Sequence, residues 1–111
     1  MDTGSLLTTI HQAGELRVRL RLARPSDALN VRGFLERQRP ALAGDVRRFT
    51  FFDPRERVVL LATTPREGGE WIVGLVDAGE GPPLVLGDEP ELVELLTAAG
   101  SSLSARVRKA A

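Results

Sequence analysis

Cysteine and tyrosine are absent from the 111-residue chain, and histidine, methionine and tryptophan occur once each. Without cysteine there is no disulfide framework, thiolate nucleophile or thiolate metal ligand. The lone His11 cannot form a histidine cluster, and it lies in a weakly patterned stretch without an evident orienting partner. We therefore predict no metal site and assign no catalytic residue.

An excess of charge of one sign is also lacking. Fifteen basic residues balance fifteen acidic ones, which argues against a nucleic-acid partner. No apolar run approaches the roughly 20 residues that cross a bilayer, and the first residues do not resemble an export signal. We predict a cytoplasmic protein without a membrane partner. All basic residues except Lys109 are arginines, which is typical of a GC-rich genome and indicates a bacterial source.

The length and a hydrophobic content of 42% predict one globular domain. We expect an α+β fold in which a mainly antiparallel four-stranded sheet packs with two to three helices. Residues 15–100 form this domain, residues 1–14 are a loose lead-in, and residues 101–111 are a basic tail or a short helix.

Residues 16–22 alternate aliphatic and arginine side chains with a period of two, which predicts a strand. Its arginine face, formed by Arg17, Arg19 and Arg21, is interpreted either as a solvated sheet surface or as a platform for an anionic ligand.

A helix should follow this strand, with Ser26 as its cap and Asp27 in its first turn. Apolar residues at helical spacing predict that it covers residues 28–38. Residues 41–48 form a shorter helix or a loop. Phe49, Phe51 and Phe52 come next and are interpreted as an aromatic plug beneath the first helix.

Residues 57–64 are continuously aliphatic or β-branched, which predicts a central strand buried on both faces. A turn longer than two residues, within 65–70, leads to an antiparallel strand at 71–77, and residues 84–86 form a short fourth strand. The last helix opens with Asp88 as its cap and Pro90 in its first turn, and Gly100 can end it.

The order of these segments resembles the opening two thirds of a GNAT-type N-acetyltransferase. The resemblance is carried by residues 18–28 with their Arg-Pro-Ser-Asp corner, by Phe34 and Leu35, by residues 58–62, and by Trp71-Ile72-Val73-Gly74. It implies a GNAT-like fold and acetyl transfer to an amine. It also implies acetyl-CoA between the fourth strand and the next helix, in contact with the backbone of Val85, Leu86 and Gly87.

The chain departs from that family at the cofactor loop. Where the family has several glycines whose N–H groups hold the diphosphate, this sequence has only Gly87, and Pro90 lacks an N–H. Asp88, Glu89 and Glu91 place three carboxylates at the same position, and they would repel a phosphate. The further strands that complete the cleft, and the family's tyrosine acid, have no counterpart here.

We therefore expect no cofactor and a non-catalytic GNAT-like domain that acts through protein association, as a homodimer or an adaptor. Its contact surface is either the strand edge at 84–86 or the aromatic loop at 49–52. The alternative is a minimal acetyltransferase that binds acetyl-CoA, with a cleft completed across a dimer. A third hypothesis is a small-molecule sensor that uses the arginine face.

Overall fold

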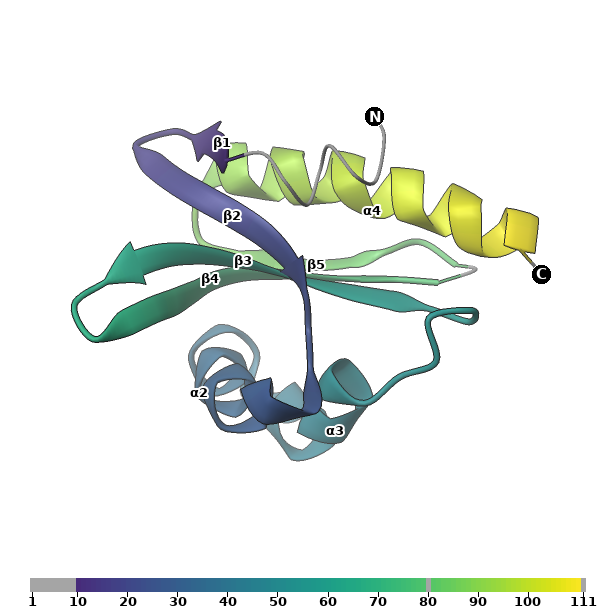
Figure 1. Ribbon diagram of the computed structural model, residues 1–111, viewed down its shortest axis with the longest axis horizontal. Coiled ribbons are helices and arrows are strands. Elements are labelled where there is room, and N and C mark those ends of the chain that lie inside the picture. The colour runs from purple at the N-terminus through teal and green to yellow at the C-terminus, as the bar shows by residue number, and fades with distance from the viewer. Residues whose placement is uncertain (1–9, 80, 111) are drawn as a thin grey trace.

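The computed structural model describes residues 10–79 and 81–110. In chain order the elements are β1 (Ile10–Ala13), β2 (Leu16–Leu22), a 3₁₀ turn (Pro25–Asp27), α2 (Ala28–Gln38), a 3₁₀ segment (Pro40–Asp45), α3 (Val46–Thr50), β3 (Val58–Arg66), β4 (Gly69–Ala78), β5 (Leu84–Gly87) and α4 (Pro90–Ala110). The strands form one antiparallel sheet in the order β1-β2-β3-β4-β5. Figure 1 shows α4 on one face of this sheet and α2 with α3 on the other.

The α+β class is confirmed, but the sheet has five strands rather than four. The additional strand, β1, lies in the predicted lead-in and pairs with β2 across a tight turn. Gly14 adopts a φ of 62° in that turn, a left-handed conformation that glycine accepts readily. Ile10–Ala13 lacks a clear alternation because only Ala13 is buried, and the pattern therefore did not indicate a strand. The other lead-in residues, 1–9, lie outside the described part.

The β3–β4 hairpin is longer than predicted, and its turn is shorter. Arg66 pairs with Gly69, so that only Glu67 and Gly68 form the turn. Gly68 has a φ of 86°, which explains the need for glycine. The prediction of a turn longer than two residues was wrong because the hairpin continues through polar residues that resemble a loop in composition.

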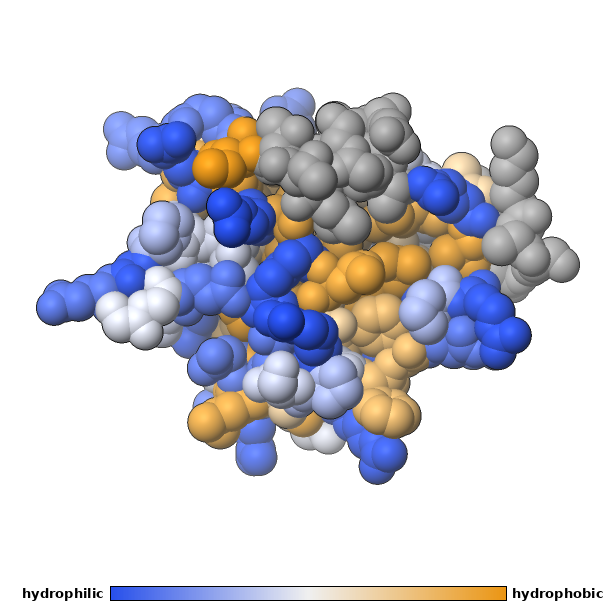
Figure 2. Space-filling model, viewed as in Figure 1, coloured by the Kyte–Doolittle hydropathy of each residue, from blue (hydrophilic) through white to orange (hydrophobic). Residues whose placement is uncertain are grey.

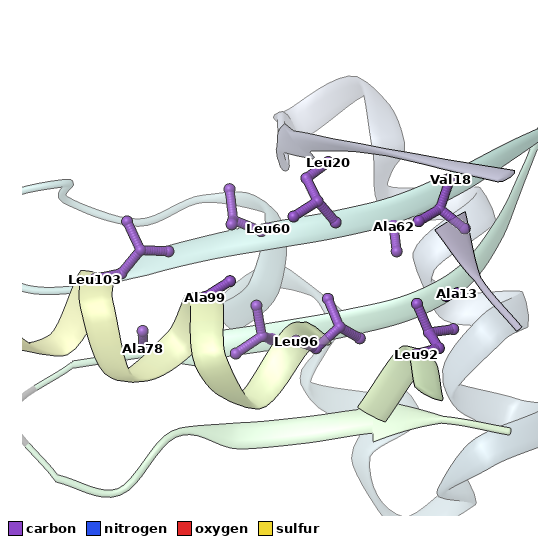
Figure 3. Close-up of a cluster of buried hydrophobic side chains, with 11 residues drawn as sticks. Ala13, Val18, Leu20, Leu60, Ala62, Ala78, Leu92, Leu96, Ala99 and Leu103 are labelled. Atoms are coloured by element: carbon purple, nitrogen blue, oxygen red, sulfur yellow. The ribbon is translucent and has the colours of Figure 1, made fainter. Parts of the chain in front are cut away.

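Successive residues of β3 face opposite layers, so the sheet supports two hydrophobic cores. Leu60 and Ala62 face α4 and pack with Leu96, as Figure 3 shows, whereas Val59 and Leu61 face the α2–α3 layer. The core on the α4 face consists of Ala13, Val18, Leu20, Leu60, Ala62, Val76, Ala78, Leu92, Leu96, Ala99 and Leu103. The core on the α2–α3 face consists of Ala23, Val31, Phe34, Leu35, Phe49, Val59, Leu61, Ile72, Leu75 and Leu86.

The helix predicted at residues 28–38 is α2, with the same bounds. The segment predicted at 41–48 is a 3₁₀ segment followed by α3. Phe49 is fully buried under α2, as the aromatic-plug prediction requires, but Phe51 is 64% exposed. Arg47 lies over the Phe51 ring at 5.2 Å. The plug prediction was therefore wrong for Phe51, because α3 ends at Thr50 and the chain turns outward.

Gly100 does not end the last helix, since α4 continues to Ala110. A Cβ atom on Gly100 would lie 2.8 Å from Val76 Cγ2 and 2.9 Å from Pro83 Cβ. The glycine therefore permits the close approach of α4 to the sheet rather than a left-handed cap. Leu103, in the predicted tail, is buried in the core on the α4 face, so this part of the tail belongs to the domain.

Hydrophilic and hydrophobic side chains gather on different parts of the surface. Figure 2 shows hydrophilic side chains over most of the left part of the viewed face and hydrophobic ones right of its centre. Leu22, at the end of β2, is 42% exposed.

Candidate association surface

One edge of the sheet is formed by β5. This strand pairs with β4 over its whole length, from Gly87 opposite Gly74 to Leu84 opposite Asp77. Among the described residues, no strand pairs with its other edge. The four residues Leu84–Gly87 carry no charge, and Leu86 alone is buried. The strand therefore offers unpaired backbone groups and lacks the charged side chains that usually protect a sheet edge.

A basic pocket lies where β5 begins. Asp77, at the end of β4, is 8% exposed, and Arg57 donates from Nη2 to its Oδ2 at 2.7 Å. Arg57 also donates to the backbone carbonyl oxygen of Arg48 at 2.9 Å. The pocket measures about 540 Å³ and is lined by Arg48, Arg55, Glu56, Arg57, Asp77, Gly79, Gly81, Pro82, Leu84 and Val107.

The two arginines that contact Asp77 are held differently. Arg48 Nη2 reaches Asp77 Oδ2 at 3.3 Å, and 48% of its side chain is exposed. The side chain of Arg57 is 25% exposed and makes the shorter contact. Arg57 thus provides the main compensation for the buried Asp77 carboxylate, and Arg48 adds a longer and more exposed contact.

An acidic turn lies where β5 ends, at residues 88–91. Asp88 Oδ1 accepts a hydrogen bond from Gln38 Nε2 of α2 at 2.5 Å. The first helical hydrogen bond of α4 runs from the Val93 N–H to the Glu89 carbonyl oxygen at 2.9 Å. The cap position is therefore Glu89, and the prediction that Asp88 caps the helix was wrong, because its carboxylate is turned toward α2 instead.

The residues predicted to contact acetyl-CoA under the alternative hypothesis, Val85, Leu86 and Gly87, all lie on β5. Leu86 is in the core on the α2–α3 face, and Val85 packs against the core under α4. Asp88 and Glu89 follow directly and are exposed. Their carboxylates lie beside the position that the resemblance assigns to a diphosphate, and like charges there repel.

The arginine face of β2 is only partly available to a ligand. Arg21 donates from Nη1 and Nη2 to the two carboxylate oxygens of Asp27 at 2.8 and 2.7 Å, and from Nε to Glu70 Oε1 at 2.9 Å. Arg17 and Arg19 are exposed and line a separate pocket of about 320 Å³. Under the sensor hypothesis, Arg17 and Arg19 are therefore accessible to a ligand, whereas Arg21 is already paired with Asp27 and Glu70.

Asp27, rather than Ser26, holds the corner after β2. Its Oδ2 accepts the Arg24 backbone N–H at 2.7 Å. The hydrogen bonds from the Arg21 guanidinium lower the pKa of the Asp27 carboxyl, although burial opposes this shift. The prediction assigned the cap to Ser26, but the bidentate pair with Arg21 fixes the Asp27 carboxylate at this corner.

His11 lies on β1 opposite Val18. In the part of the chain that the structure describes, no group of three His, Cys, Asp or Glu side chains could hold a metal ion. None of the helices at residues 10–79 and 81–110 combines the length and apolar character of a membrane span. Comparisons of this chain with protein-family models, with curated proteins and with solved structures find no match.

Proposed function

We propose that the protein is a non-catalytic domain that acts through protein association, by pairing the open edge of β5 with the same edge of a second copy. The observation that carries this proposal is the uncharged strand Leu84–Gly87, which among residues 10–79 and 81–110 pairs with β4 only. Natural sheets usually protect such an edge with charges, prolines, bulges or a covering element, or pair it with another chain; here Pro82 and Pro83 precede β5 but do not lie within it.

Symmetry favours a second copy as the partner. Most soluble oligomers are homo-oligomers, and a twofold dimer uses one self-complementary surface patch. An edge strand can pair antiparallel with its own copy, which here would join two five-stranded sheets into one. The strand has four residues, so side chains beside it must supply part of the binding free energy.

The scaffold itself is proposed to be GNAT-like. After β1, the order β2, α2, α3, β3, β4, β5, α4 follows the segment order on which the resemblance rests, and this supports the proposal. The acidic turn after β5 supports the view that the scaffold works without acetyl-CoA. In this interpretation the edge used for association is the one beside the expected cofactor position.

Sedimentation velocity on the intact chain tests the association. Over protein concentrations of about 1 to 300 µM, we expect the fraction of dimer to rise with concentration, because a small interface gives weak association. Val85→Lys places a charge on β5 and should shift the equilibrium to the monomer, while an unchanged far-ultraviolet circular dichroism spectrum and melting temperature show that the packing of Val85 under α4 is kept. Thr64→Lys, at a partly buried β-branched position of the central strand β3, is the matched control and should leave it unchanged. A wild-type monomer at the highest concentration would refute the proposal.

Acetyl-CoA titration of the same preparation tests the non-catalytic part. We expect no saturable increase in melting temperature, because Asp88 and Glu89 would repel the diphosphate. Since a ligand that binds the native state stabilises it by mass action, a saturable increase at micromolar acetyl-CoA would instead establish the acetyltransferase alternative.

A further inference from the structure

We infer that the acidic turn of each copy docks against Arg48 of the other, so that two symmetric ion-pair contacts flank the paired β5 strands. This inference rests on the proposed function, because it requires β5 to pair with β5. It adds the side chains that select a second copy as the partner.

The charges stand at opposite ends of the same strand. Leu84, the first residue of β5, lines the pocket that contains Arg48. Gly87, the last residue, is followed at once by Asp88 and Glu89. When a strand pairs antiparallel with its own copy, the start of one strand lies beside the end of the other. The basic end of each copy then meets the acidic end of its partner.

The charges also lie on the same face of the sheet. Arg48 belongs to α3, and Asp88 is held by Gln38 of α2. Both helices cover the same face, as Figure 1 shows. Neighbouring antiparallel strands related by a twofold axis perpendicular to the sheet keep the α2–α3 layers of both copies on one side. The acidic turn and the arginine pocket therefore meet on that side.

The register brings the carboxylates to the mouth of the pocket. Residues paired in an antiparallel ladder have their side chains on the same face of the sheet, so the twofold axis passes through a residue of β5 rather than between two. With the axis at Val85, Asp88 of the second copy falls opposite Pro82, and with the axis at Leu86 it falls opposite Leu84. Both Pro82 and Leu84 line the pocket, so the contact does not depend on which of these two registers forms.

The pocket is suited to receive a carboxylate. Pro82 and Pro83 have no backbone N–H, so the strand ladder cannot extend past Leu84 and leaves room for side chains. Arg48 is the more weakly held of the two arginines, at 3.3 Å from Asp77, and its fork can bind a second carboxylate. Exposed ion pairs contribute modestly, so losing both symmetric contacts should weaken the dimer about tenfold.

A charge-swap series tests this contact by sedimentation equilibrium. We expect Arg48→Glu and Asp88→Arg each to weaken the dimer about tenfold or more, and the double variant to recover to within about threefold of wild type. Arg47→Glu is the matched control. Arg47 is the preceding residue of α3 and lies over Phe51 outside the pocket, so its loss should leave the dimer unchanged.

The outcomes separate this inference from the proposed function. A wild-type monomer would refute both. A wild-type dimer that the two single variants leave intact would refute the ion-pair contact alone, as would a double variant without recovery. If Arg48→Glu unfolds because it places a carboxylate beside Asp77, Arg48→Gln provides the same test without an added charge, and an unchanged dimer would again refute the contact.

Discussion

At the scale of single residues, the Arg21 guanidinium connects three segments of the chain. It binds Asp27 in the 3₁₀ turn after β2 and Glu70 near the start of β4, 49 positions away in the sequence. Its hydrogen bonds lower the pKa of the Asp27 carboxyl and of the Glu70 carboxyl. Asp27 and Glu70 in turn raise the pKa of Arg21, and an arginine side chain is not deprotonated in proteins. Arg21, Asp27 and Glu70 therefore hold three segments of the fold together rather than form a binding site.

We expect Asp27→Asn to lower the free energy of unfolding by about 2 kcal/mol at pH 7, because a partly buried Arg21 loses its bidentate partner. Asp27 has a lower pKa in the folded state than in the unfolded chain. Its contribution is therefore complete above the unfolded value of about 4 and is lost as the pH falls through the folded value. In urea denaturation between pH 2 and 7, the free energy of unfolding of the variant should fall less at acidic pH than that of the wild-type protein.

Asp45→Asn is the control for this series, since Asp45 is exposed and makes no side-chain hydrogen bond at the start of α3. It should follow the wild-type curve. If Asp27→Asn followed that curve as well, the pair with Arg21 would make no measurable contribution to stability.

At the scale of elements, glycines set how closely α4 approaches the sheet. A Cβ on Gly74 of β4 would lie 2.7 Å from Leu96 Cδ1, and one on Gly100 of α4 would lie 2.8 Å from Val76 Cγ2. In an antiparallel sheet with a helix on this face, both positions must lack a side chain for Leu96 and Val76 to reach the core. At these two points a glycine backbone contacts a side chain of the opposite element, so that α4 lies closer to the sheet than two facing side chains would allow.

Two alanine substitutions in helices should therefore have opposite effects. Gly33→Ala in α2 adds a Cβ at an ordinary 3.7 Å from Arg37 Nη1 and should stabilise the protein by about 0.5 to 1 kcal/mol. Gly100→Ala gains the same helix propensity but overpacks against Val76 and Pro83, so we expect a net loss of about 1 kcal/mol. Thermal unfolding measures both, and a more stable Gly100→Ala would contradict the close approach of α4.

At the scale of the whole molecule, two cores share one sheet. Leu60 and Leu61 are neighbours in β3, yet the first belongs to the core under α4 and the second to the core against α2 and α3. Neither helical layer can lose its core without exposing one face of the same strands. The two layers are therefore expected to unfold together.

Leu96→Ala, in the core under α4, tests this coupling. We expect it to lower the free energy of unfolding by about 3 kcal/mol, as the loss of a buried leucine side chain does. Trp71 reports on the other layer, since Arg37 of α2 lies over its ring at 4.2 Å. Trp71 fluorescence and far-ultraviolet circular dichroism should give one common urea transition. Separate transitions would show that the two cores unfold independently.

Local patterns predicted the elements that form the two cores. Helical spacing of Val31, Phe34 and Leu35 located α2, and alternation located β2, because burial of one face imposes a period on the sequence. The same patterns did not indicate β1, in which a single residue is buried. These patterns also led to the wrong prediction that the last helix ends at Gly100, because a glycine required by tertiary packing cannot be distinguished in sequence from one that caps a helix.

The contacts of Asp77 and Asp88 depended on the tertiary structure. The sequence placed Asp77 in an apolar strand and Asp88 at a helix start, but neither position indicated a partner. Arg57 reaches Asp77 across 20 positions, and Gln38 reaches Asp88 across 50. Local periodicity carries information about which face is buried, whereas the meeting of distant side chains depends on how strands and layers are arranged. For that reason the sequence alone determined most of the elements, the charge balance and the carboxylates that follow β5, and only the fold brought Arg48 and Arg57 to the start of that strand.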